Sequence, residues 1–149
     1  MATKRQSQKP RPRKRILPAA RLQLHRFWLQ ELSYSLTNGP IGEMAEDIPL
    51  AGESEVSELD DGYLVRLTLR ARQTKRPRSP FKFKMVLSGH FGLRGEADEA
   101  GQRLAYVNGS AMLYSIARGI ISMITGIGEA TVRLPMINFA AFLEKDADA

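Results

Sequence analysis

Residues 110–127 read SAMLYSIARGIISMITGI, and this stretch decides what kind of fold the chain adopts. Its apolar side chains recur at spacings of three and four, which indicates a helix with an apolar face. We expect Ser110 to act as the N-cap, and Gly126 and Gly128 suit the C-terminal cap. The apolar positions cover more than one stripe, so the pattern predicts burial on two sides. One layer would be the chain's own sheet, and a partner subunit is a candidate for the other.

The residues before this helix alternate between apolar and polar side chains, which is the period of a half-buried strand. A long strand is predicted over 22–36, with a bend near Gln30. Its mostly apolar face consists of Leu22, Leu24, Trp28, Leu32, Tyr34 and Leu36. Further strands are predicted over 54–59, 63–72 and 81–93.

Turn and cap signals connect these elements. Asp61-Gly62 is a strong two-residue hairpin signal. Residues 104–108 are expected to form one helical turn or a strand-like lid, and Asn138 is expected to cap a short final helix over 139–145. The sequence therefore predicts an α+β fold, in which one long helix packs on a four-stranded antiparallel sheet with one apolar and one polar face.

The charge of the chain is unevenly distributed. The 149 residues carry a net charge of +6, a length typical of about one domain. Residues 1–26 hold nine basic side chains and no acid, whereas the rest of the chain holds 13 bases and 16 acids. We predict a disordered basic arm over 1–20, a folded domain over 21–143 and a frayed acidic tail over 144–149.

Composition excludes several classes of site. Without cysteine the chain has no disulfide, thiol nucleophile or Cys-ligated zinc. No phosphate-cradling glycine loop and no hydrolase motif is present, and His25 and His90 are expected to be structural or surface residues, so we predict no enzyme, no cofactor and no metal. No secretory signal is visible, and the apolar run 111–127 is too short to span a bilayer, which favours a cytoplasmic protein.

Two basic clusters suit the phosphates of a nucleic acid, and they support an alternative function as a small nucleic-acid-binding protein. One cluster lies in the arm and the other within residues 70–84. The candidate anion-binding residues are Arg11, Arg13, Lys14, Arg15, Arg70, Arg72, Lys75 and Arg76. Aromatic residues for base stacking are not interleaved with these bases, and a solvated tail with a charged sheet face explains them equally well.

The order of the elements and several local strings resemble the family of the bacterial protein-export chaperone SecB. The best string is 112–123, MLYSIARGIISM, which is similar to the family's helix, with an Ala-Arg pair followed by an apolar pair and Ser-Met. Residues 134–139, LPMINF, are similar to the segment after that helix, and 26–38 are similar to the first strand. The resemblance covers about residues 21–143.

The resemblance implies a holdase, a chaperone that keeps unfolded client polypeptides from folding and uses no ATP. It also implies a homotetramer, built as a dimer of dimers with helices between sheets. Apolar grooves would hold the client, because burial of its apolar segments supplies affinity. On this mapping the groove draws on Val56, Tyr106, Met112, Met123, Ile124, Phe139 and Phe142.

The chain departs from the export members of the family where they meet the SecA motor. Those members often end in a zinc tail containing Cys and His, and residues 144–149 contain neither. Glu31 matches one acid that the family presents to SecA, but Ser35 replaces a second, and Lys82 and Lys84 add positive charge. These departures favour a dedicated client, such as the antitoxin of a toxin–antitoxin system, over export preproteins, and both clients stay open.

Overall fold

The computed structural model describes residues 20–36, 50–71, 81–126 and 134–141. The strands are β1 (Leu22–Leu36), β2 (Leu50–Leu59), β3 (Gly62–Ala71) and β4 (Phe81–Leu93). A continuous helical rod follows, made of α1 (Glu99–Leu104), the π-helical segment η1 (Ala105–Gly109) and α2 (Ser110–Gly126). The end of α2 at Gly126 agrees with the prediction, and Gly128 lies outside the described residues.

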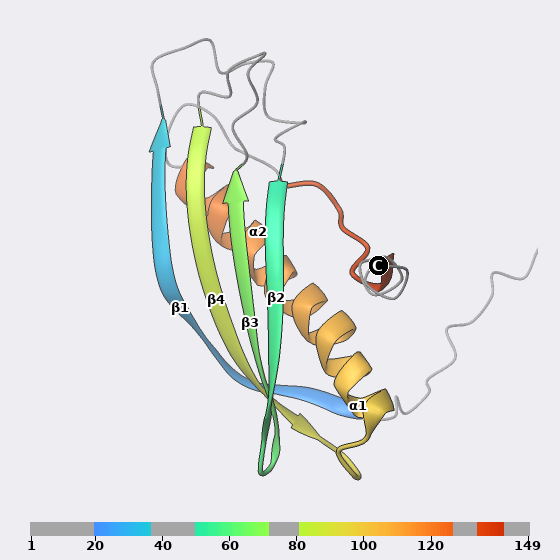
Figure 1. Ribbon diagram of the computed structural model, residues 1–149. Coiled ribbons are helices and arrows are strands. Elements are labelled where there is room, and N and C mark those ends of the chain that lie inside the picture. Colours follow the sequence, from blue (N-terminus) through green and yellow to red (C-terminus); the bar gives the residue numbers. More distant parts are fainter. Residues whose placement is uncertain (1–19, 37–49, 72–80, 127–133, 142–149) are drawn as a thin grey trace, which may run out of the picture.

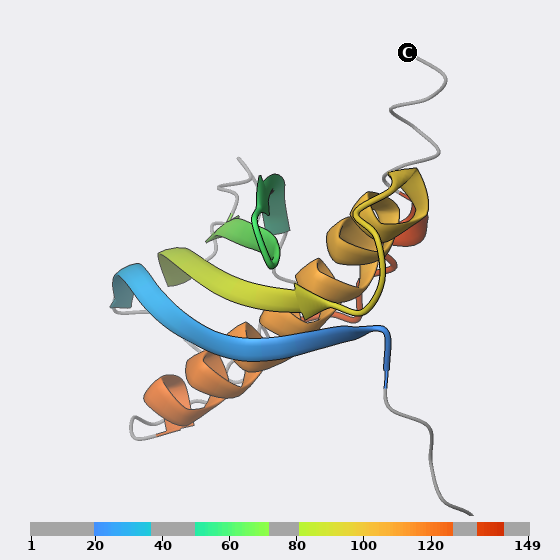
Figure 2. The ribbon, with the colours of Figure 1, turned by 90° about the horizontal axis from the view of Figure 1, so that it is seen from below.

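The strands form one antiparallel sheet in the order β1-β4-β3-β2, and α2 runs diagonally across one of its faces (Figure 1, Figure 2). We call the face that α2 covers the inner face and the opposite one the outer face. The core lies between the inner face and α2, whose residues Leu113, Ala117 and Ile121 are buried. The strands contribute Tyr63, Val65, Leu67, Leu69, Met85, Leu87 and Phe91. This arrangement confirms the predicted α+β fold.

The hairpin between β2 and β3 turns at Asp60-Asp61, where the sequence predicts it. β2 begins at Leu50, before its predicted start at residue 54. A Cβ atom on Gly62 would lie 1.9 Å from the carbonyl oxygen of Phe91. Glycine is therefore required at the start of β3, because any side chain would push β4 away.

β1 pairs with β4 through two register shifts, one between Leu24 and Arg26 and one between Leu29 and Glu31. The second shift falls at the predicted bend near Gln30. Each shift adds one residue to β1 and exchanges the faces of the residues between them. Trp28 therefore pairs with Ser88 on the outer face, so its predicted place beside the other apolar residues of β1 is wrong.

The helical rod begins earlier than predicted, because Asp98 is the N-cap and its Oδ1 accepts a hydrogen bond from the backbone N–H of Gly101 at 2.7 Å. Ser110 has helical angles, φ −63° and ψ −40°, and lies inside the rod, so the prediction that it caps a helix is wrong. Its buried hydroxyl pairs instead with that of Ser54 on β2, at 2.5 Å. A serine hydroxyl can serve either role, and here the nearby strand determines which.

Residues 134–141 form a second layer on α2. This layer covers part of the helix side that points away from the sheet, which was predicted to be buried. Arg118 Nε donates a hydrogen bond to the carbonyl oxygen of Leu134 at 3.1 Å. Asn138 Oδ1 accepts one from the N–H of Ala140 at 3.1 Å, as its predicted capping role requires. The rest of the predicted final helix, 142–145, lies outside the described residues.

Candidate functional site

The side of α2 that points away from the sheet is the most open apolar surface of the helix. Met112 is 41% exposed and Met123 is 65% exposed. Ser115 and Gly119 lie between them at helical spacing and are exposed too. A Cβ atom on Gly119 would meet nothing within 4 Å. We call Met112, Ser115, Gly119 and Met123 the outward stripe.

A second apolar surface lies on β1. Phe27, Leu29 and Tyr34 pair in register with Gly89, Leu87 and Phe83, so they belong to the inner face. They nevertheless stay 48%, 40% and 47% exposed, respectively, because the helix leaves much of β1 uncovered. We call these three residues the β1 patch. The sequence-based site did not include them, and the unbroken apolar run at 27–29 was the available signal.

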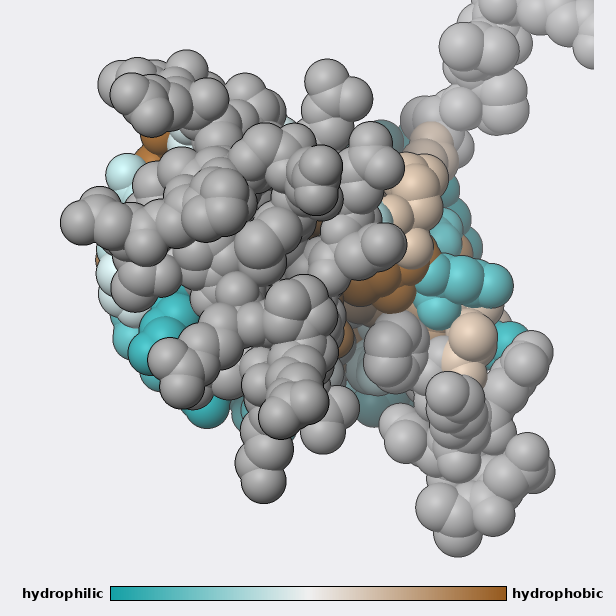
Figure 3. All heavy atoms as spheres, turned by 90° about the horizontal axis from the view of Figure 1, so that it is seen from above, coloured by the Kyte–Doolittle hydropathy of each residue, from teal (hydrophilic) through white to brown (hydrophobic). Residues whose placement is uncertain are grey.

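Segment 134–141 adds a third apolar contribution and is fixed to α2. Met136 is 81% exposed, and its sulfur accepts a hydrogen bond from Arg118 at 3.0 Å. The Tyr114 hydroxyl donates a hydrogen bond to the carbonyl oxygen of Pro135. Burial raises the pKa of Tyr114 above its ordinary value near 10, so this donor stays protonated at neutral pH. Apolar side chains also show at the surface beside hydrophilic ones in Figure 3.

The predicted client-binding residues lie on several different elements and do not form one surface. Met112 and Met123 share the outward stripe, and Ile124 follows on α2, half-buried. Val56 is half-buried on the inner face of β2, two residues from Ser54, which binds the rod at Ser110. Tyr106 is half-buried in η1, the segment that contacts β2.

The last two predicted client-binding residues belong to the end of the chain. Phe139 is 8% exposed and packs edge-on against Tyr114, with ring centroids 5.7 Å apart, so it is part of the core. Phe142 lies outside the described residues. A role in client binding stays a prediction for all seven residues.

The outer face carries the residues of the predicted motor and anion sites that the structure describes. Glu31 forms an ion pair with Lys84, with 3.1 Å between Oε2 and Nζ. Arg70 is exposed on β3. The other predicted anion-binding residues, in the arm and at 72–76, lie outside the described residues.

The structure brings together the two histidines, which are far apart in the sequence. The rings of His25 and His90 stack with centroids 5.3 Å apart, and His90 Nε2 lies 3.1 Å from Asp61 Oδ1. This hydrogen bond from His90 lowers the pKa of Asp61 below its ordinary value of 3.8. Across the described stretches, no group of His, Asp and Glu side chains is arranged to hold a metal ion.

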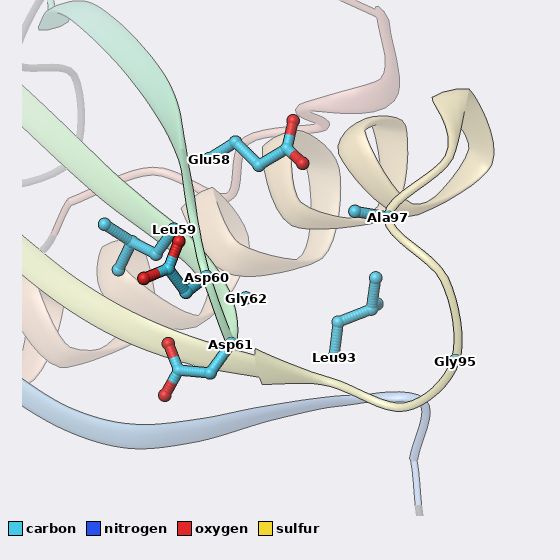
Figure 4. A pocket seen from close by; sticks show the side chains of 8 residues that line it. All are labelled: Glu58, Leu59, Asp60, Asp61, Gly62, Leu93, Gly95 and Ala97. Carbon is cyan, nitrogen blue, oxygen red and sulfur yellow. The ribbon is translucent and has the colours of Figure 1, made fainter.

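A cleft of about 530 Å³ lies between the β2–β3 turn and the connection from β4 to α1 (Figure 4). Glu58, Asp60 and Asp61 line one side, and Leu93 and Ala97 line the other. None of the predicted client-binding residues lines it. Its walls are acidic and mainly polar, which does not suit apolar polypeptide segments.

No helix within the described ranges has both the length and the apolar character needed to cross a membrane.

Comparison with known proteins supports the fold. No family model and no curated protein sequence matches the chain. One similar solved structure is the Mycobacterium tuberculosis SecB-like chaperone Rv1957 in complex with a ChAD peptide from the antitoxin HigA1, with a TM-score of 0.63 and 18% identity over 78% of this chain and 91% of that one. Another is a Streptococcus agalactiae protein of unknown function, with a TM-score of 0.53 and 14% identity over 80% of this chain and 100% of that one. The chain therefore has a SecB-like fold.

Proposed function

We propose that this chain is an ATP-independent holdase that binds unfolded polypeptide through apolar side chains on the helix side of the sheet. The observation that carries the proposal is the location of its exposed large apolar residues. Within the described residues, all of them except Leu59 belong to the outward stripe, the β1 patch or segment 134–141. Exposed apolar surface concentrated on one side is typical of a protein-binding site.

The chemistry of this surface suits clients of varied sequence. Its exposed methionines, Met112, Met123 and Met136, have flexible and polarisable side chains that adapt to different partners. Burial of apolar client surface contributes about 25 cal/mol per Å², so binding needs no nucleotide. The proposal assigns no catalytic role and no cofactor, and places the protein in the cytoplasm.

The client class that we propose is an antitoxin-type protein, with export preproteins as the alternative. Rv1957, which has a similar fold, was solved in complex with a peptide from an antitoxin, and this supports the first class. Docking on SecA receives less support, because Lys84 already neutralises Glu31, the acid proposed for that contact. Toxin and antitoxin genes beside the gene for this chain would favour the first class, and their absence would favour export.

We further propose that copies of the chain form a homotetramer, built as a dimer of dimers, in which Ser115 and Gly119 at the centre of the outward stripe contact a second copy while the methionines at its ends stay open to clients. Ser115 and Gly119 are small and exposed, so a helix of a second copy can approach closely between Met112 and Met123. Light scattering on the purified protein would measure the mass. Gly119→Arg is expected to reduce that mass without unfolding the chain, because the monomer has open space at this position.

The holdase proposal is tested by diluting a urea-unfolded client into buffer without ATP and following aggregation by light scattering. The wild-type chain is expected to suppress aggregation, and Met123→Asp is expected to weaken this because it places a charge in the outward stripe. The matched control is Ser57→Asp, which adds the same charge at an exposed position on the outer face. A wild-type chain without effect, or equal loss in both variants, would contradict the proposal.

A further inference from the structure

The outer face presents exposed basic side chains on β3 and β4. Arg66 and Arg70 are exposed on β3, and Lys82 is exposed on β4. Arg70 lies directly across from Lys84 in the antiparallel register. Arg66 lies directly across from Glu55 on β2. Lys84 is paired with Glu31, but no ion pair joins Arg70 or Lys82 to an acid within the part of the chain that the structure describes.

The directly paired neighbours distinguish Arg70, Lys82 and Lys84 from Arg66. Arg70 has Ala51 as its partner on β2, and Lys82 and Lys84 have Ser35 and Ser33 as partners on β1. Like charges directly opposite each other in a sheet destabilise it, and these cross-strand partners carry no compensating carboxylate. A bound anionic group would remove this repulsion. The helix does not cover this face, so it is accessible from solvent (Figure 1).

We propose that Arg70, Lys82 and Lys84 form a docking surface for an acidic polypeptide segment of a partner protein. Carboxylates match the guanidinium group of Arg70 in charge and in hydrogen-bonding geometry. The hydroxyl groups of Ser33 and Ser35 add polar contacts on the same face.

Within the described residues, the aromatic rings of the outer face already contact other side chains, which does not suit the alternative occupant, a single-stranded nucleic acid. The guanidinium carbon of Arg26 lies 5.3 Å from the ring centroid of Trp28. His90 is stacked on His25. Base stacking on aromatic side chains supplies much of the affinity for single strands. The charges on this face therefore favour an acidic peptide over an oligonucleotide.

Trp28 provides the measurement, because it is the only tryptophan of the chain and lies on the outer face. We would titrate the full-length protein with poly-L-glutamate, record Trp28 fluorescence, and repeat the titration with an oligo-dT strand. Poly-L-glutamate is expected to bind and to change the emission. Arg70→Glu combined with Lys82→Glu is expected to weaken binding at least about tenfold, because like charges then meet across the interface.

The matched control is Arg103→Glu, which reverses an exposed charge on α1 rather than on the sheet and is expected to leave binding unchanged. If the double variant fails to fold by circular dichroism, Arg70→Gln combined with Lys82→Gln replaces it, with a smaller expected loss. An unchanged emission, equal loss in the control, or tighter binding of oligo-dT would each overturn the proposal. The aggregation assay above does not depend on these residues, so failure of the docking surface leaves the holdase proposal intact.

Discussion

The inner and outer faces of the sheet are built from the same strands but differ in burial and in charge. On β3, Leu67 is 1% exposed, whereas the adjacent Arg66 is exposed on the opposite face. The inner face supplies the core and the outer face carries charges without a cover. Because side chains alternate along a strand, one face stabilises the fold and the other determines the surface charge. Substitutions on the two faces should therefore change the free energy of unfolding by different amounts.

The largest expected effect comes from truncating the inner face. Leu67→Ala is expected to lower the free energy of unfolding by about 2–5 kcal/mol, because it leaves a cavity in a packed core. Urea unfolding followed by circular dichroism would measure it. The control is the next residue, Thr68→Ala, which is half-buried on the outer face and should cost less than about 1 kcal/mol. Equal costs would contradict the assignment of faces.

A smaller effect of opposite sign is expected on the helix. Gly119→Ala should raise the free energy of unfolding by about 0.5–1 kcal/mol, since alanine favours the helix and its Cβ meets nothing within 4 Å. Gly109→Ala on the same rod should instead destabilise, because its Cβ would lie 3.0 Å from Val65. Thermal unfolding of both variants checks this, and a loss of stability in Gly119→Ala would contradict the prediction and mean that a second copy already fills the space at this position.

A still smaller effect is expected for the ion pair on the outer face. Glu31→Gln should cost at most about 0.5 kcal/mol, since both partners are partly exposed and water screens their attraction. Urea unfolding at low and high salt would measure the cost, which should vanish at high salt. A salt-independent cost as large as that of Leu67→Ala would mean that the outer face also holds the fold together.

The smallest effect at neutral pH concerns the start of the helix that covers the inner face. The N–H of Gly101 holds the pKa of Asp98 below its ordinary value of 3.8, and Arg21 adds to this. Because the folded-state pKa is the lower one, this stabilisation is present above the unfolded value and is lost as pH falls through the folded pKa.

Asp98→Asn keeps a side-chain acceptor at the N-cap but removes its titration. The variant should therefore lose less stability than the wild-type chain as the pH falls below about 4. Urea midpoints measured from neutral pH to pH 2 would show this, and identical acid limbs would contradict it. Asp61 also has a lowered pKa, so the acid limb should become shallower without disappearing.

The regular parts of the fold followed from the sequence, and the irregular parts did not. β3 and β4 alternate without interruption, so their period alone assigns each residue to a face. The extra residues of β1 are determined by its pairing with β4, which a single-strand pattern cannot show. Trp28 was therefore assigned to the wrong face, although three consecutive apolar residues at 27–29 signalled that the alternation breaks there.

Helix α1 was missed, and 104–108 was predicted only as one helical turn or a lid, for a different reason. The buried positions of α1 and η1 are Gly101, Ala105 and Gly109, which carry almost no apolar side chain and so give no hydrophobic periodicity. The same limit applies to the candidate site. The spacing of Met112 and Met123 predicted a helix, but only the position of the rod on the sheet shows that both side chains point outward.

The π-helical segment sets the rotation of α2 about its own axis. Buried residues recur at every fourth position along the rod, namely Gly101, Ala105, Gly109, Leu113, Ala117 and Ile121. In a regular α-helix each such step turns the contact line by about 40°, whereas the wider turns of η1 take up part of this rotation. Removing one residue from η1 would rotate α2 by about 100° relative to the sheet. The number of residues in η1 thus determines the orientation of α2, and with it whether the methionines of α2 face solvent or the core.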